Sequence, residues 1–137
     1  MAFQSINPAT DKLIQNYDEH SAKQSNSILN DVQNAFQEWK KTSFSERSRF
    51  MKNAATILRK NADQYARLMT EEMGKPITQS KAEIEKCAWC CEFYADNAEK
   101  FLADEMIQTD ASKSYVHFEP LGVILAIMPW NFPFWQV

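Results

Sequence analysis

The sequence has 137 residues, of which 45% are hydrophobic and 24% are charged, and its net charge is −3. This composition is ordinary for a soluble globular chain. The negative charge, with basic residues interleaved among acidic ones, argues against a nucleic-acid-binding surface, because such a surface needs basic residues clustered on one face.

The first twenty residues predict a short β-hairpin. Asn7-Pro8-Ala9-Thr10-Asp11 is a strong turn signal, because Asn before Pro favours turn initiation and Asp tolerates turn geometry. Apolar residues, Leu13 and Ile14 among them, flank this turn. We therefore expect two extended segments joined by residues 7–11.

Three amphipathic helices are expected next. Apolar residues recur every three or four positions over residues 21–40, over about 45–72, and again from Ile84 to Leu102. That spacing is typical of helices with one buried stripe. The pattern predicts three consecutive helices before the first of the later strands.

Short local signals mark the ends of these helices. Ser43 followed three residues later by Glu46 predicts a capping box at the start of the second helix. Gly74 can adopt the left-handed conformation that ends this helix. Pro76 suits the first turn of the third helix, where a missing N–H has no cost.

Two strands are predicted after the helices. The pattern of residues 114–119 predicts a short strand with Tyr115 and His117 on one face. The run from Val123 to Met128 is too short for an ordinary helix and rich in branched aliphatic side chains. It predicts a strand buried on both faces, as in a parallel sheet.

A proline-bounded turn follows this run. In Pro129-Trp130-Asn131-Phe132-Pro133 the two prolines stop regular structure and restrict the backbone. Open α/β sheets bind ligands at the carboxyl ends of their strands, where this turn would lie. From spacing alone, Asn131 either caps the turn or contacts a ligand. A buried parallel strand needs neighbours and none follows, so the chain looks like the front of a larger protein.

A membrane span over residues 121–137 is the rival interpretation of this segment. Its seventeen residues are at the lower edge of spanning length. Two prolines, Asn131 and Gln136 interrupt it, and no basic anchor lies nearby, so we favour a soluble chain. The start of the sequence lacks the features of a signal peptide, and the three cysteines are expected to be reduced thiols of a cytoplasmic protein.

The cysteines and histidines do not predict a metal site. Cys87, Cys90 and Cys91 fall in the middle of a helical stripe, and the two histidines, His20 and His117, lie far along the chain from them. A zinc site needs four ligands in tetrahedral array. We interpret the three thiols as structural and expect no metal. His117 is a hydrogen-bonded structural histidine by default, with catalysis as the alternative.

The proline-bounded turn carries a family resemblance. Residues 129–133, preceded by Glu119-Pro120-Leu121-Gly122-Val123, resemble the signature of the aldehyde dehydrogenases. Asn7-Pro8-Ala9-Thr10, the pair Trp39 and Arg47, and Glu72-Met73-Gly74-Lys75-Pro76 follow the same family in order. The whole chain resembles the N-terminal part of the family. Residues 85–89, 110–115 and 128–137 are most similar to the bacterial succinate-semialdehyde dehydrogenase branch.

The resemblance implies an α/β fold, seen here as the N-terminal portion of the aldehyde dehydrogenase fold. Residues 1–108 would form the N-terminal helical part of the cofactor-binding domain, with a short hairpin and three helices. Residues 109–121 would form the oligomerisation strand segment. Residues 122–137 would supply the first strand of the Rossmann-like cofactor domain and its proline-bounded turn.

The resemblance also implies a mechanism. In the family a cysteine thiolate attacks the aldehyde, NADP or NAD accepts a hydride, and a glutamate activates water to release the acid. Asn131 would donate its amide to the oxyanion, and Met128, Pro129, Trp130 and Asn131 would line the cofactor cleft. The family's nucleophile and glutamate lie beyond Val137, so the chain alone is expected to be inactive.

The expected partners follow from the same resemblance. They are a small aldehyde, succinate semialdehyde in this branch, and further copies of the full-length protein in a dimer or tetramer, with no nucleic acid and no membrane. The alternative is a stand-alone helical interaction module that binds a partner and catalyses nothing.

Overall fold

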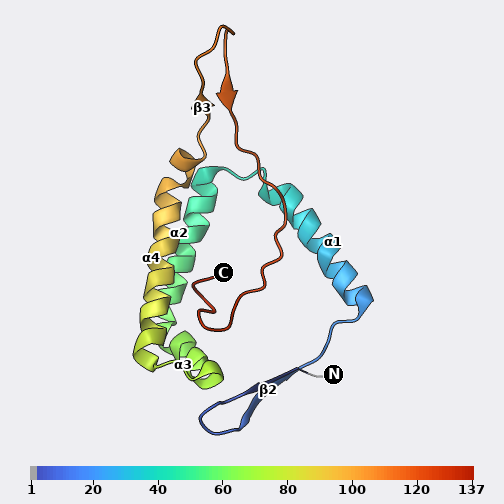
Figure 1. Ribbon diagram of the computed structural model, residues 1–137, viewed down its shortest axis with the longest axis vertical. Helices are drawn as coiled ribbons and strands as arrows, with labels where there is room; N and C mark the ends of the chain where they lie inside the picture. Colours follow the sequence, from blue (N-terminus) through green and yellow to red (C-terminus); the bar gives the residue numbers. More distant parts are fainter. Residues whose placement is uncertain (1–2) are drawn as a thin grey trace.

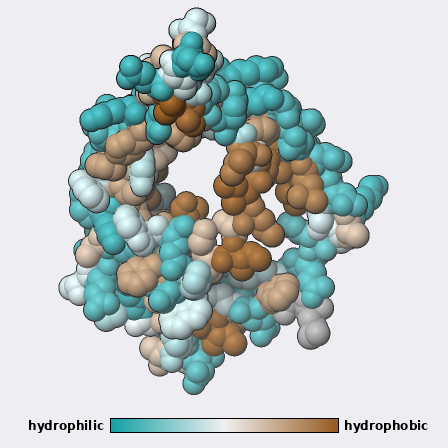
Figure 2. All heavy atoms as spheres, turned by 45° about the horizontal axis from the view of Figure 1, so that its top comes forward, coloured by the Kyte–Doolittle hydropathy of each residue, from teal (hydrophilic) through white to brown (hydrophobic). Residues whose placement is uncertain are grey.

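The computed structural model describes residues 3–137, whose helices and strands are arranged as an open frame (Figure 1). With all heavy atoms drawn, a central opening is still visible (Figure 2). Of the four helices in the described residues, three make one side of the frame and one makes the other, and a hairpin lies at one end (Figure 1). The C-terminal segment runs back between the two sides (Figure 1). Among the described residues, no helix is both long enough and apolar enough to cross a membrane.

The predicted N-terminal hairpin is present. Strands β1 (Phe3–Ile6) and β2 (Leu13–Tyr17) pair antiparallel. In the turn, the Asn7 side-chain oxygen accepts a hydrogen bond from the Ala9 N–H at 2.9 Å. Asp11 takes a positive φ of 55°, which Asp tolerates better than most residues. The turn residues therefore form the hairpin that their chemistry predicts.

The first helix forms where it was predicted, but its predicted buried stripe is wrong for the described residues, because the stripe has no packing partner among them. Helix α1 (Ala22–Trp39) begins after Ser21, whose hydroxyl accepts from the Gln24 N–H at 3.3 Å. The Gln24 side chain accepts in return from the Ser21 N–H at 2.8 Å, which completes a capping box. No side chain of α1 is buried, and the helix stands apart from the other three (Figure 1).

The prediction of a single helix over about residues 45–72 is wrong, because two helices occupy this span. Helix α2 (Phe44–Lys60) and helix α3 (Ala62–Met73) meet at Asn61, whose φ and ψ of −107° and 17° leave the helical region. The Asn61 amide donates to the carbonyl of Ile57 at 3.0 Å, a local bond that competes with the helix ladder. The apolar stripe continues through this break, which is why periodicity did not reveal it.

The caps of α2 and α3 follow the sequence signals with one change. The Ser43 hydroxyl accepts from the Glu46 N–H at 3.1 Å, which is one half of the predicted capping box. Gly74 ends α3 in the left-handed conformation, with φ of 73°, as predicted. Pro76 is the capping residue of the next helix instead of a member of its first turn.

Helix α4 (Ile77–Phe101) is the centre of the small core. It packs along α2 and against α3 (Figure 1). Its buried face repeats at helical spacing and consists of Ser80, Glu83, Ile84, Cys87 and Ala88. From the partner helices this face receives Ala55, Ala66 and Met69. The carboxylate of Glu83 thus lies inside a largely apolar stripe, in which Ser80 is the other polar residue.

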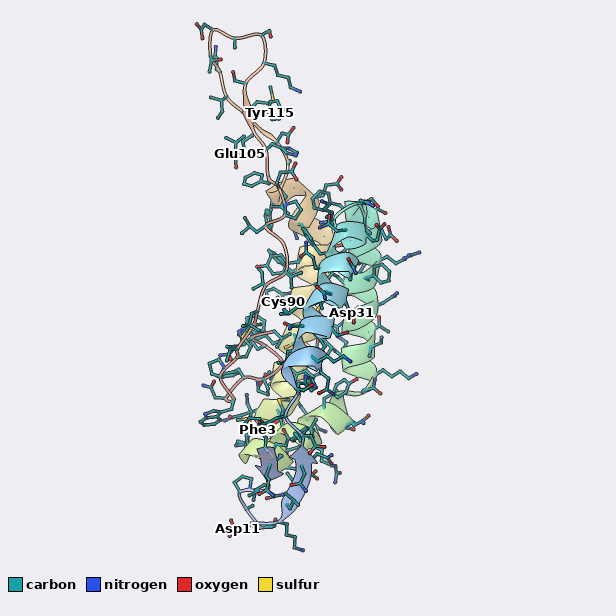
Figure 3. All side chains as sticks on the ribbon, turned by 90° about the vertical axis from the view of Figure 1, so that its right-hand side faces the viewer. Phe3, Asp11, Asp31, Cys90, Glu105 and Tyr115 are labelled. Carbon is teal, nitrogen blue, oxygen red and sulfur yellow. The ribbon has the colours of Figure 1, made fainter. Side chains whose placement is uncertain are left out.

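A narrow ribbon projects beyond the helices (Figure 3). It consists of β3 (Glu105–Met106) and β4 (Tyr115–Val116), which pair antiparallel. The predicted strand over residues 114–119 is therefore correct for only two residues. Few backbone hydrogen bonds hold this ribbon, so its shape depends on side-chain contacts at its base.

The predicted buried strand from Val123 to Met128 is wrong in this structure. These residues take no regular secondary structure, and Ile124, Leu125 and Ile127 are 78%, 84% and 83% exposed. A strand needs a hydrogen-bonded neighbour, and the two sheets among residues 3–137 contain none beside this run. Figure 2 shows hydrophobic side chains gathered around the central opening, where this segment passes.

Candidate functional site

The proline-bounded turn is fixed against the start of α4 by two charged side chains. The ammonium of Lys75 donates to the backbone carbonyl of Asn131 at 3.2 Å. One carboxylate oxygen of Glu83 accepts from the backbone N–H groups of Phe134 and Trp135, at 3.0 Å each. The turn is therefore tied to the helical core through its backbone, on both sides of Pro133.

Aromatic contacts fix the far side of the same turn. The Phe134 ring lies 5.3 Å from the ring of Tyr65 on α3, measured between centroids. The ammonium of Lys86 lies 3.7 Å above the Trp135 ring, a cation–π contact. These contacts leave the turn little freedom to rotate about its attachment to α4.

The predicted site residues lie at the exposed end of this fixed turn. Met128 and Trp130 are 40% and 74% exposed, and Pro129 and Asn131 are exposed too. The backbone carbonyl of Asn131 is engaged by Lys75, whereas its side-chain amide has no hydrogen-bond partner among residues 3–137. The arrangement presents one amide on a rigid backbone, next to an exposed indole.

An open hollow of about 580 Å³ borders the turn. Trp130, Pro133 and Phe134 form one wall, and the hairpin and α3 form the others. Across it, the Ser5 hydroxyl donates to the Glu72 carboxylate at 2.9 Å and ties the hairpin to α3. The sequence did not predict that the hairpin would border the turn.

Two of the three thiols, Cys87 and Cys91, are poorly suited to nucleophilic attack. Cys87 is 7% exposed, and burial together with the nearby negative charge of Glu83 raises the pKa of its thiol to about 11. Burial also raises the pKa of Cys91. A raised thiol pKa leaves little thiolate near neutral pH, and the thiolate is the nucleophile. Among residues 3–137, no group of three His, Cys, Asp or Glu side chains is placed to hold a metal ion.

His117 lies on the ribbon between two carboxylates. Its Nδ1 contacts the Asp104 carboxylate, and its Nε2 lies 3.2 Å from Glu119. The Asp104 carboxylate raises the pKa of His117 through this hydrogen bond and its charge. These contacts agree with the hydrogen-bonded structural histidine that the sequence suggested by default.

Sequence reasoning missed Lys75 and Glu83, the two residues that fix the turn. In the sequence, Lys75 stands out only as part of the segment Glu72-Met73-Gly74-Lys75-Pro76, and Glu83 belongs to no motif. A signal was present, because Glu83 falls at the spacing of Ser80, Ile84 and Cys87 on the buried face of α4. A charged residue in a buried stripe is unusual enough to require a partner.

Comparisons with known proteins agree on one family. The sequence model described as the aldehyde dehydrogenase family matches residues 1–137. The chain is 51% identical over 137 residues to a Synechocystis protein named probable succinate-semialdehyde dehydrogenase (NADP(+)), covering 100% of the chain and 30% of that protein. It is 41% identical over 139 residues to succinate-semialdehyde dehydrogenase (NADP(+)) 1 of Mycobacterium tuberculosis, covering 99% of the chain and 30% of that protein.

A solved structure shares the fold. The succinic semialdehyde dehydrogenase of Streptococcus pyogenes, in complex with NADP+ as the cofactor, superimposes with a TM-score of 0.92 at 34% identity. The match covers 98% of this chain and 30% of that one. The chain therefore spans about 30% of the length of the relatives it matches.

Proposed function

The chain belongs to the aldehyde dehydrogenase family, and from this membership we propose that the full-length protein oxidises an aldehyde to a carboxylic acid. The proposed reaction consumes the aldehyde, water and NADP+ or NAD+. It yields the acid, the reduced nicotinamide and a proton. In this proposal residues 1–137 position and stabilise reacting groups, because the raised pKa values of Cys87 and Cys91 make these thiols poor nucleophiles.

We propose succinate semialdehyde as the substrate and NADP+ as the preferred cofactor. The names of the Synechocystis and Mycobacterium tuberculosis relatives support both choices. The Streptococcus pyogenes structure, solved with NADP+, supports the cofactor. NAD+ is the alternative cofactor, and comparing the two nucleotides in one assay separates them.

The observation that carries the proposal is the state of Asn131. Lys75 holds its backbone carbonyl, while its side-chain amide is free of hydrogen bonds to residues 3–137. An amide N–H is a neutral donor that can stabilise a developing oxyanion without transferring a proton. A fixed backbone allows that donor to be in place before the reaction begins, which is the source of its catalytic effect.

The residues before Asn131 fit one end of a nicotinamide cofactor. Trp130 is 74% exposed and, with Met128 and Pro129, offers an apolar surface next to the amide. When bound, the cofactor supplies the hydride acceptor. We propose that Met128, Pro129, Trp130 and Asn131 line its nicotinamide-ribose side and exclude water there, because such sites are mostly apolar with few polar groups.

We also propose a separate structural role for each of three segments of the chain. Residues 1–108 would form the helical part of the cofactor domain, and residues 109–121 would join subunits of a homo-oligomer. The projecting ribbon supports the second part, because its short strands leave edges that another chain could pair with (Figure 3). Residues 122–137 would provide the turn with Asn131.

The test is a kinetic comparison in the full-length protein. Asn131→Ala should lower kcat by about two to three orders of magnitude, the usual effect of removing one oxyanion donor. Reduction of NADP+ or NAD+ by succinate semialdehyde, followed by absorbance of the reduced nicotinamide, gives kcat and KM. Asn30→Ala, the same change on the exposed face of α1, is the matched control and should leave kcat unchanged.

The assay also separates the proposal from its rival. A helical interaction module would reduce neither nucleotide with any aldehyde, and Asn131→Ala would then change nothing measurable. Activity that Asn131→Ala leaves intact would refute the role of the amide while keeping the reaction. Activity with other aldehydes but not with succinate semialdehyde would refute only the substrate.

A further inference from the structure

Lys75 and Glu83 form a buried ion pair beneath the proposed site. Their side chains are 6% and 1% exposed, and the ammonium contacts one oxygen of the carboxylate. Removing two charges from water is costly, and replacing such a pair by apolar residues of similar volume is often neutral or stabilising. The stability of the helices alone therefore does not account for the pair.

The remaining hydrogen-bonding capacity of both charges is directed to the turn. Besides Glu83, the Lys75 ammonium reaches the carbonyl of Asn131 at 3.2 Å and lies 3.9 Å from the centroid of the Phe132 ring. The second oxygen of Glu83 accepts from the two backbone N–H groups that follow Pro133. One end of the pair thus holds the peptide of Asn131, and the other holds the chain just beyond it.

We propose that Lys75 and Glu83 are positioning residues, which act through the turn to hold the Asn131 amide in its productive orientation. The inference rests on the proposed function, because it assigns a task to Asn131. A buried pair suits this task, since each charge is satisfied only while the turn stays in place. If the turn moves away, the ammonium loses a carbonyl and the carboxylate loses two N–H donors.

The direct test is Glu83→Gln in the full-length protein. Glutamine keeps the size and one acceptor oxygen, but it removes the charge that neutralises Lys75. A displacement of a reacting group by about 1 Å can cost a hundredfold in rate. We expect kcat to fall by about tenfold to a hundredfold, with little change in KM for the aldehyde or the nucleotide.

A matched control lies on the same helix. Glu85 is also ion-paired, with Arg59 at 2.9 Å, but its contacts do not include the turn. Glu85→Gln makes the same chemical change in an exposed pair, and kcat should stay at the wild-type value. An equal fall in kcat for Glu85→Gln and Glu83→Gln would refute the proposal, because any lost ion pair would then have the same effect.

A double-mutant cycle distinguishes positioning from a general structural role. If Glu83 acts through Asn131, Glu83→Gln should cost less than about threefold in kcat once Asn131 is already alanine. Full additivity of the two changes would refute the proposal. If Asn131→Ala alone leaves kcat unchanged, the role of the amide fails first; if Asn131→Ala lowers kcat and Glu83→Gln does not, only the positioning role fails.

A second variant keeps the test decisive if Glu83→Gln does not fold. Glu83→Asp keeps the charge and shortens the side chain by one methylene, so the ion pair can form while the grip on the two N–H groups weakens. We expect kcat between those of wild type and Asn131→Ala, in a protein that still unfolds cooperatively at a somewhat lower thermal midpoint. A folded Glu83→Asp protein with wild-type kcat would overturn the inference.

Discussion

The thiol of Cys87 offers a prediction that can be worked through quantitatively. Burial and the charge of Glu83 raise its pKa to about 11. At about pH 8, roughly one such thiol in a thousand is a thiolate, against roughly one in four for an unperturbed cysteine. The thiolate population is therefore about two hundred times smaller.

A second effect works in the opposite direction. A thiolate of higher pKa is intrinsically more nucleophilic, by about tenfold for this difference in pKa. The smaller population outweighs that gain, so folded Cys87 should react with an aromatic disulfide reagent about twentyfold more slowly than a free cysteine. Its exposed fraction of 7% can only slow the reaction further.

The assay is site-resolved labelling of the full-length protein at about pH 8, followed by mass spectrometry of the peptide that contains Cys87. The same protein unfolded in urea is the control, because there Cys87 should react as an ordinary thiol. We also expect the rate in the folded protein to keep rising above pH 9. Rates within about twofold in the folded and unfolded protein would refute the burial argument and reopen Cys87 as a nucleophile.

Three further predictions concern the scaffold. The pKa of His117 is raised by Asp104, so this contact stabilises the fold at pH values below the ordinary histidine pKa and loses its effect as pH rises through the raised one. Asp104→Asn should lower the pKa of His117 in an NMR titration; an unchanged pKa would exclude Asp104 as its cause. Gly74→Ala should lower the free energy of unfolding by about 1–2 kcal/mol, because φ is 73° and the new Cβ would lie 3.3 Å from Pro8. A urea midpoint equal to that of wild type would contradict this. Ile84 is fully buried, so Ile84→Ala should cost about 2–5 kcal/mol and Ile84→Val about 1 kcal/mol in the same unfolding measurement, and equal losses would argue against close packing there.

Local chemistry predicted the parts of the fold that depend on neighbouring residues. The turn at Asn7, the helical span of α1 and the left-handed end at Gly74 each follow from nearby side chains. The break at Asn61 could not be predicted from the apolar spacing, because the spacing continues unchanged through it. The Asn61 side-chain amide bonds to the Ile57 carbonyl there and competes with the hydrogen bonds of a continuous helix. Local signals therefore predicted most helix ends, but they did not predict the boundary between α2 and α3.

Features that depend on distant partners could not be predicted in the same way. The run from Val123 to Met128 has the composition of a buried strand, yet strand formation depends on neighbours that composition does not provide. The turn motif revealed Asn131 by resemblance, whereas the support from Lys75 and Glu83 comes from another part of the chain. In the sequence, only the position of Glu83 within the buried stripe of α4 could have indicated this support.

The distance along the chain between the turn and its anchors bears on the order of folding. Helices α2, α3 and α4 are consecutive and pack on one another, so they close short loops at low entropic cost and can assemble early. The turn meets its anchors across 56 residues at Lys75 and 51 residues at Glu83. Such contacts close long loops at a high entropic cost. They stabilise the chain only once the packed helices hold Lys75 and Glu83 in place. We therefore expect Asn131 to reach its position late in folding, after the three helices have packed together.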